Sequence, residues 1–174
     1  MNLLPDIIGY FLKVLFIGFN PGMKSAASGH HYAGNSNSFW KLLYESGLTS
    51  VRLKPEEDVR LLELGMGSAN IADRPTRSAA ELTACELREG TVSLMTKLRE
   101  YSPQIACYMG IGAYRIVTGQ KMIKAGAQPA GLIEGITDYV CSSPSGLNRI
   151  PYPDQLSYFK GLKILVDSSD ISLL

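Results

Sequence analysis

The chain has 174 residues, of which 45% are hydrophobic and 19% charged, and its formal net charge at pH 7 is +1. This composition is ordinary for a globular protein, and the length predicts a single domain, residues 1–174, with a proper core. The near-neutral charge gives no sign of a polyanion partner, although it can hide a local basic surface. We find no internal repeat, low-complexity tract or linker.

The cysteines Cys85, Cys107 and Cys141 lie far apart in the sequence, and their spacing matches no metal site. We therefore expect a reduced protein. The first residues lack the basic region, apolar core and small-residue cleavage site of an export signal, and no apolar run approaches the length of a membrane span. The sequence thus predicts a cytoplasmic protein with no membrane partner.

The first predicted element is a strand at Val14–Ile17, an apolar run that indicates burial on both faces of a sheet. Gly18-Phe19-Asn20-Pro21-Gly22 follows and forces a turn at the carboxyl end of that strand. Open α/β sheets bind their ligands at this end of their strands. A polar loop at 29–37 then carries one aromatic residue, Tyr32, which is typical of a loop that faces a site or solvent.

The next elements are helices and a weak strand. A helix is predicted at Asn37–Ser46, with Ser36 or Asn37 as its N-cap and Gly47 as its end. The remaining predictions follow in chain order: an irregular or short helical lead-in at 5–10 over the sheet edge, a helix within 51–64, a weak strand at 65–74, a helix from the Thr83–Glu86 capping box to Tyr101, a strand at 104–109, a helix at 113–118, a strand at 137–142 and a helix from Pro153 to about Val166. The segment 121–135 has no clear pattern.

Strands that alternate with helices predict an α/β fold, a three-layer α/β/α arrangement with a central, mainly parallel four-stranded sheet. Polar loops at the four strand ends would then converge on one edge, as at an α/β active site. These loops are Asn20–Gly22, Asn70–Arg74, Gly110–Gly112 and Ser143–Arg149. Because Gly, Pro, Asn and Ser are also the standard turn residues, each loop has turn chemistry as its alternative.

Two residue types raise other kinds of chemistry. His30 and His31 could suggest a metal, but adjacent side chains in an extended loop point in opposite directions and the chain has no other histidine. We therefore expect no metal. Lys24 could be a Schiff-base nucleophile, although a lysine in a polar loop is more often a solvated charge.

Two further features have a structural and a functional interpretation. Asp73 and Arg74 could be an acid with its activator, but we favour a pair that orients the loop. Tyr32 could pack in the core, but a lone aromatic in a Gly/Asn/Ser loop is better placed to stack on a planar ligand.

Several of these stretches together carry a resemblance to the mismatch-specific uracil-DNA and thymine-DNA glycosylases. Their first motif is similar to Gly18–Gly22, Ser25-Ala26, Gly29–Gly34 and Phe39–Lys41, and the second motif of their bacterial branch is similar to Pro144–Arg149. Asp73–Thr76 and Glu86–Gly90 also resemble the family pattern at matching separations. The resemblance therefore covers nearly the whole chain.

The resemblance implies hydrolysis of the N-glycosidic bond of uracil, or of thymine, opposite guanine in double-stranded DNA, by a monomer without a cofactor. In that family the asparagine of the first motif positions the attacking water, a role that falls here on Asn20. An amide is a weaker activator than a carboxylate, so turnover is expected to be slow. Tyr32 matches the aromatic that stacks on the flipped base, and Asn70 matches an amide that reads the base edge. Gly18, Phe19 and Ser25 complete the expected base site.

The second motif implies a wedge that fills the vacated stack and contacts the widowed guanine. Its expected residues are Ser145, Gly146, Leu147, Asn148 and Arg149. Extrusion of a nucleotide costs a few kcal/mol, which an apolar wedge would offset. Ser143 stands where related proteins carry Asn or Met, which leaves the tolerance for thymine open. Two alternatives also stay open: a related glycosylase for hypoxanthine or ethenocytosine, and a non-catalytic mismatched-DNA-binding protein, against which Asn20 weighs.

Overall fold

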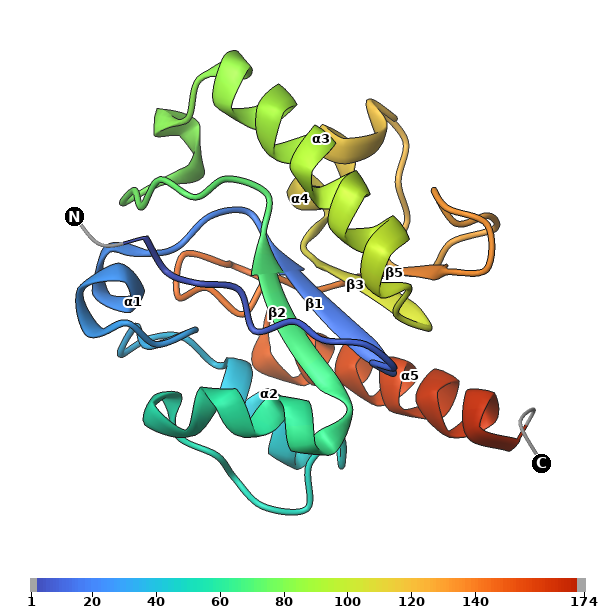
Figure 1. The fold of residues 1–174 in the computed structure, drawn as a ribbon. Helices are drawn as coiled ribbons and strands as arrows, with labels where there is room; N and C mark the ends of the chain where they lie inside the picture. The colour runs from blue at the N-terminus through green and yellow to red at the C-terminus, as the bar shows by residue number, and fades with distance from the viewer. Residues whose placement is uncertain (1–2, 172–174) are drawn as a thin grey trace.

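A computed structural model describes residues 3–171 of the protein. Five strands form one sheet in the order β2-β1-β3-β5-β4 (Figure 1). They are β1 Val14–Gly18, β2 Met66–Asn70, β3 Ile105–Met109, β4 Gly126–Ala127 and β5 Thr137–Cys141. All neighbouring strands are parallel except β4, which pairs antiparallel with β5. The predicted α/β fold with a mainly parallel sheet is therefore confirmed.

The predicted number of four strands is wrong because of β4. This strand has two residues and lies in the Gly- and Ala-rich segment 121–135, which shows no clear sequence pattern. Its two residues pair with Val140 and Tyr139 at the edge of the sheet. A strand of two residues is too short to show the alternation that identifies a strand from sequence.

Side chains of successive strand residues enter two separate cores. In β1, Val14 and Phe16 belong to one cluster and Leu15 and Ile17 to the other, as expected from the period of two residues in a strand. Helices α2 and α5 cover the first face, and α3 and α4 cover the second (Figure 1). All five β1 residues are buried, which fits the predicted central strand.

The helices follow the predicted order, with differences at their ends. They are α1 Met23–Ser28, α2 Phe39–Glu45, α3 Ala84–Tyr101, α4 Ile111–Thr118 and α5 Tyr152–Ile171, with 3-10 helices η1 Pro55–Leu64 and η2 Ala79–Glu81. Helix α1 was not predicted. Helix α2 begins two residues later than expected, because the Asn37 side chain accepts a hydrogen bond from Phe39 N ahead of the first turn. The capping box is confirmed: Thr83 Oγ1 accepts from Glu86 N at 3.2 Å, and Glu86 Oε2 accepts from Thr83 N at 2.7 Å.

The segment before β1 lies along the outer edge of β2, as predicted (Figure 1). Ile7 and Ser68 exchange two backbone hydrogen bonds of 2.8 Å in antiparallel fashion. The edge of β2 therefore has a partner at this point, which limits its exposure to other chains. Over residues 3–171, no helix combines the length and the apolar character that a bilayer crossing requires.

Candidate active site

A cavity of about 680 Å³ lies at the carboxyl edge of the sheet. All four predicted loops contribute to its wall, through Asn20, Asn70, Gly110 and the segment Ser143–Asn148. The loop 29–37 contributes as well, and Tyr32 is among its lining residues. The structure therefore brings together strand ends that are up to about 120 residues apart in the sequence, as parallel strands require.

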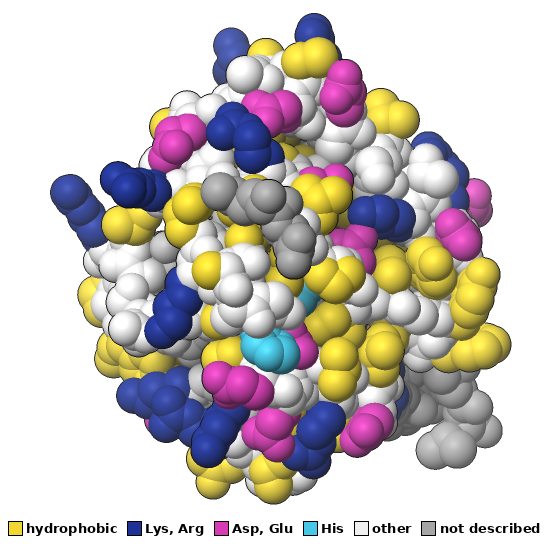
Figure 2. Space-filling model, turned by 60° about the vertical axis from the view of Figure 1, so that its left-hand side comes forward, with side chains coloured by type: hydrophobic (Ala, Val, Ile, Leu, Met, Phe, Trp, Pro, Cys, Tyr) yellow, Lys and Arg dark blue, Asp and Glu magenta, His cyan; other side chains and the backbone are white. Residues whose placement is uncertain are grey.

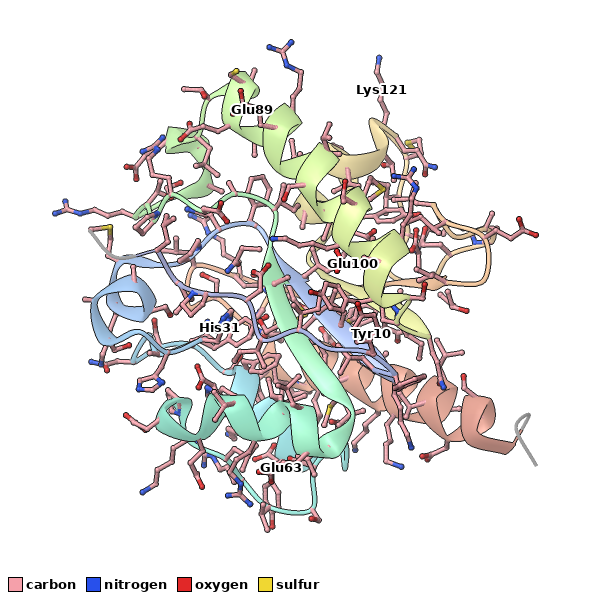
Figure 3. All side chains as sticks on the ribbon, viewed as in Figure 1. Tyr10, His31, Glu63, Glu89, Glu100 and Lys121 are labelled. Atoms are coloured by element: carbon pink, nitrogen blue, oxygen red, sulfur yellow. The ribbon has the colours of Figure 1, made fainter. Side chains whose placement is uncertain are left out.

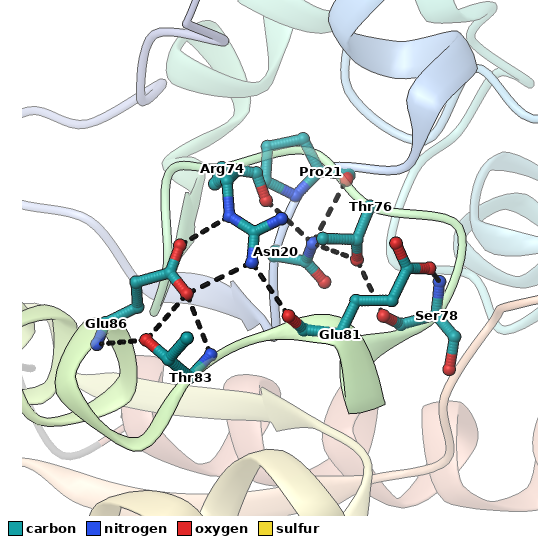
Figure 4. A network of polar contacts seen from close by, with 8 residues as sticks. All are labelled: Asn20, Pro21, Arg74, Thr76, Ser78, Glu81, Thr83 and Glu86. Carbon is teal, nitrogen blue, oxygen red and sulfur yellow. Dashed lines mark hydrogen bonds and ion pairs between the residues drawn. The ribbon is translucent and has the colours of Figure 1, made fainter.

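The Asn20 amide has one orientation, which its partners determine. Its Nδ2 donates to Arg74 O at 2.9 Å and to Thr76 Oγ1 at 2.7 Å (Figure 4). A backbone carbonyl can only accept, and Thr76 Oγ1 uses its own hydrogen on Ser78 O at 2.8 Å. Both neighbours thus require the NH₂ group of Asn20. Its Oδ1 has no hydrogen-bond partner within the described residues and remains available as an acceptor in the cavity wall.

Asn70 and Gly18 sit side by side at the ends of β2 and β1, where they are paired in register. A Cβ atom on Gly18 would lie 2.5 Å from Asn70 Oδ1, so a larger residue at position 18 would displace the Asn70 side chain. Within the described residues the Asn70 amide has no hydrogen-bond partner, and it lines the cavity. It can therefore offer both a donor and an acceptor to a ligand.

Tyr32 is both a packed residue and a lining residue. Its ring stacks on Phe39 with a centroid distance of 3.7 Å and an interplanar angle of 20°. The Tyr32 hydroxyl oxygen lies 3.2 Å from Ser68 Oγ. Burial raises the pKa of Tyr32 well above its usual value, so the phenol stays neutral. Tyr32 therefore packs against the core and also lines the cavity, and its stacking on a planar ligand stays a prediction.

His31 also lines the cavity, but both of its ring nitrogens have hydrogen-bond partners. Figure 3 marks His31 on the segment between α1 and α2. The Nε2 of His31 lies 2.9 Å from Pro5 O, and its Nδ1 lies 2.9 Å from Ser68 Oγ. Because the carbonyl of Pro5 only accepts, Nε2 carries the proton in the neutral ring. Burial lowers the pKa of His31, which keeps the ring neutral.

Ser25 and Phe19 also lie in the cavity wall, as expected. The Ser25 hydroxyl accepts a hydrogen bond from Ala33 N at 3.0 Å, so it fixes the loop next to Tyr32. Phe19 is half-buried and packs against the core on the side of α3 and α4. Ser25 therefore shapes the cavity through the backbone of a neighbouring loop.

The loop Ser143–Arg149 is docked on the segment that precedes α2. Ser38 N donates to Pro144 O at 2.9 Å, and Ser38 Oγ donates to the same oxygen at 3.2 Å. A Cβ atom on Gly146 would lie 2.1 Å from Ser36 Oγ, so this contact depends on glycine. Leu147 follows at the mouth of the cavity with 75% of its side chain exposed. The leucine thus projects from an anchored loop.

The next two side chains differ in their surroundings: Asn148 is hydrogen-bonded within the loop, and Arg149 is exposed to solvent. Asn148 Nδ2 donates to Ser142 Oγ at 2.9 Å and to Ser143 O at 2.6 Å, and its Oδ1 accepts from Ile150 N at 3.1 Å. The amide of Asn148 is therefore occupied in holding the loop. Arg149 is exposed.

Among the described residues, the charged side chains that line the cavity are few and basic. Lys24 and Arg77 are exposed residues of its rim, and Lys24 Nζ donates to Asn35 Oδ1. Figure 2 shows the side that lies on the left in Figure 1, where Lys and Arg alternate with Asp and Glu. His30 lies 3.4 Å from Asp58 Oδ1. Among the described residues, no three His, Cys, Asp or Glu side chains are grouped so that they could hold a metal ion.

The sequence assigned no role to Thr76, placed Glu86 only in the capping box, and gave Arg74 only a loop-orienting pair with Asp73. Arg74 does orient a loop, as favoured, but its partner is Glu86 and not the adjacent Asp73. The pair is separated by 12 positions, and only the fold brings it together. The one available signal was the matching separation of Asp73–Thr76 and Glu86–Gly90.

Two comparisons relate this chain to known proteins. A candidate uracil DNA glycosylase from Methanosarcina acetivorans, solved by solution NMR, has a similar fold, with a TM-score of 0.65 over 95% of this chain and 97% of that chain. The two sequences are 16% identical, so this likeness concerns the fold. The model of the uracil DNA glycosylase superfamily matches residues 5–162. The chain therefore belongs to the uracil DNA glycosylase superfamily, whose members act on DNA as glycosylases.

Proposed function

We propose that this protein is a monofunctional glycosylase that removes uracil opposite guanine from double-stranded DNA and leaves an abasic site. The observation that carries the proposal is the orientation of Asn20, whose NH₂ group is held by Arg74 O and Thr76 Oγ1. Its free Oδ1 in the cavity wall can accept a hydrogen bond from a water molecule and so aim a lone pair of that water at the sugar carbon. The proposed enzyme is a single-domain cytoplasmic monomer.

The rest of the cavity would hold a flipped base. Uracil presents a donor at N3 and carbonyl acceptors on the same edge, which matches the free acceptor and donor of Asn70. Tyr32 would stack on the ring of the base, with Phe39 supporting the opposite face of the tyrosine. Gly18, Phe19 and Ser25 would shape the remaining wall.

The loop from Ser145 to Arg149 would occupy the gap left in the duplex. Leu147 is apolar, exposed and mounted on an anchored loop, which suits insertion between bases. Because the Asn148 amide is already used within the loop, we expect contacts with the widowed guanine to come from the backbone of Ser145–Asn148. Arg149 would meet a phosphate.

A water-positioning amide implies slow chemistry. Asn20 cannot take the proton of the attacking water as a carboxylate would, so the reaction depends on the departing base to stabilise its own negative charge. Uracil is a better leaving group than an unmodified cytosine because its two carbonyl groups stabilise the negative charge of the departing base. We therefore expect a single-turnover rate far below that of a glycosylase with a carboxylate base.

The test is a cleavage assay with the full chain on matched oligonucleotides that contain G·U, A·U, G·T, single-stranded uracil, hypoxanthine or ethenocytosine. The proposal expects release of uracil from G·U, and strand scission only after alkali or heat. Faster release of hypoxanthine or ethenocytosine would reassign the lesion, and binding without release of any base would support a non-catalytic role. If borohydride trapped a covalent adduct with DNA, the nucleophile would be a lysine such as Lys24 and not water.

A further inference from the structure

Arg74 and Glu86 form a two-bond ion pair near the cavity, in two stretches that the proposed base site leaves without a role. Arg74 Nε donates to Glu86 Oε1 at 2.5 Å and Arg74 Nη2 donates to Glu86 Oε2 at 3.1 Å, a two-bond geometry (Figure 4). Arg74 Nη2 also donates to Glu81 O at 2.8 Å. Three bonds thus fix the direction of one guanidinium.

The Glu86 carboxylate is itself fixed by the first turn of α3. Its Oε2 accepts from Thr83 N at 2.7 Å and from Thr83 Oγ1 at 2.8 Å. Arg74, and then these Thr83 bonds, hold the pKa of Glu86 at about 2, so the carboxylate stays ionised near neutral pH. The ion pair therefore connects the loop that carries Arg74 to helix α3, which carries Glu86.

A second contact joins the same face of α3 to the same segment. Gly90 stands four residues after Glu86, so both lie on one side of the helix. A Cβ atom on Gly90 would lie 1.9 Å from Ile71 O, which shows how closely the helix approaches the backbone after β2. Helix α3 thus holds the segment 71–74 at both of its ends.

The segment held in this way is the one that orients Asn20. The carbonyl of Arg74 accepts from Asn20 Nδ2, and Thr76 adds its hydroxyl and a backbone bond from its N to Pro21 O at 3.2 Å. If Arg74 moved, the amide could rotate and turn its NH₂ group toward the cavity. A donor would then face the water where an acceptor is required.

We propose that Arg74 and Glu86 are positioning residues that use α3 to hold the backbone carbonyl which orients Asn20 for excision. This inference rests on the proposed function. In this arrangement the Arg74 side chain binds Glu86 and Glu81 O, and does not contact a DNA phosphate. The first turn of α3, which lies outside the cavity wall, then contributes to the excision rate.

The test compares two variants that break the ion pair in different ways. Arg74→Ala removes the guanidinium and leaves the capping box of α3 intact, and Glu86→Gln keeps an oxygen for Thr83 N but removes the charge. We expect each to lower the single-turnover rate on G·U duplex by about 10- to 100-fold, as for a small misplacement of a reacting group. The Kd for duplex with a hydrolysis-resistant 2′-fluoro uracil nucleotide should change by about twofold at most, since binding contacts are retained.

Three controls make the result specific. Thr83→Ala removes the Thr83 Oγ1 bond to Glu86 but keeps the Thr83 N bond and the ion pair, so it should lower the melting temperature and slow excision less than either ion-pair variant. Glu89→Gln removes a carboxylate of α3 that accepts a hydrogen bond from Cys85 and not from Arg74, so its excision rate should equal that of the parent. The double variant Arg74→Ala/Glu86→Gln should be no slower than the slower single variant, because both substitutions break the same interaction and their losses of rate do not add.

Several outcomes would overturn the inference. They are parental rates in both single variants, an equal loss of rate in Thr83→Ala, or a weaker Kd with a flatter salt dependence in Arg74→Ala alone, which would assign Arg74 to a phosphate. In each case an active parent and an inactive Asn20→Ala variant would leave the proposed function standing. A parent that releases no uracil would instead remove the proposed function itself.

Discussion

Tyr32 is the residue whose two roles can be separated most cleanly. Tyr32→Ala removes the stack on the flipped base and should weaken binding of uracil-containing duplex by about 1–3 kcal/mol. It also removes the ring that packs on Phe39, so the melting temperature should fall as well. Tyr32→Phe keeps both stacks and loses only the contact with Ser68. A phenylalanine variant that binds as poorly as the alanine variant would contradict base stacking.

Leu147 makes a different prediction because its side chain is exposed in the free protein. Leu147→Ala should leave the melting temperature unchanged and slow excision from duplex G·U by about tenfold, since a buried leucine side chain is worth about 1.5–3 kcal/mol. Single-stranded uracil, which needs no wedge, should be much less affected if the enzyme accepts it. Excision rates on the two substrates check this. Equal losses on both would exclude the wedge.

Among the elements, the loop Ser143–Arg149 depends on one close contact. Gly146→Ala would place a methyl group 2.1 Å from Ser36 Oγ and 3.0 Å from Ser36 O, so the loop would have to move off the segment before α2. We expect slower excision from duplex with little change in overall stability, because the loop is at the surface. The double variant Gly146→Ala/Ser36→Gly removes the Ser36 side chain and should recover part of the rate. No recovery would assign the defect to another cause.

How far the sequence predicts each element depends on whether its signal is local. The continuous apolar run Val14–Ile17 and the capping box at Thr83–Glu86 are local patterns, and the structure confirms both. Helix α1 has six residues between two glycines and shows no periodicity, so it reads as loop. The Arg74–Glu86 pair is separated by 12 positions, and the Asn148 amide is occupied through the particular conformation of its own loop. A pattern of residue types encodes neither.

At the scale of the whole molecule, His31 links the fold to pH. Burial lowers its pKa below the usual 6.5, so the unfolded chain binds this proton more readily than the folded one. The free energy of unfolding should therefore decrease as the pH falls through 6.5 toward the folded-state pKa. Denaturant unfolding at pH 8 and pH 5.5 measures the change. His31→Gln should be less stable at pH 8 but should lose less on acidification, and an equal pH dependence would show that His31 is not its source.

The most direct measurement is the single-turnover release of uracil from a G·U duplex by the parent protein and by Asn20→Ala. We expect the parent to leave an alkali-labile abasic site. The variant should bind the duplex with a Kd within about twofold of the parent but release uracil at least about 100-fold more slowly, the order of loss for one preorganised polar group. A melting temperature close to that of the parent would show that the fold is kept. Parental excision rates in folded Asn20→Ala would contradict the assignment of the attacking water to Asn20.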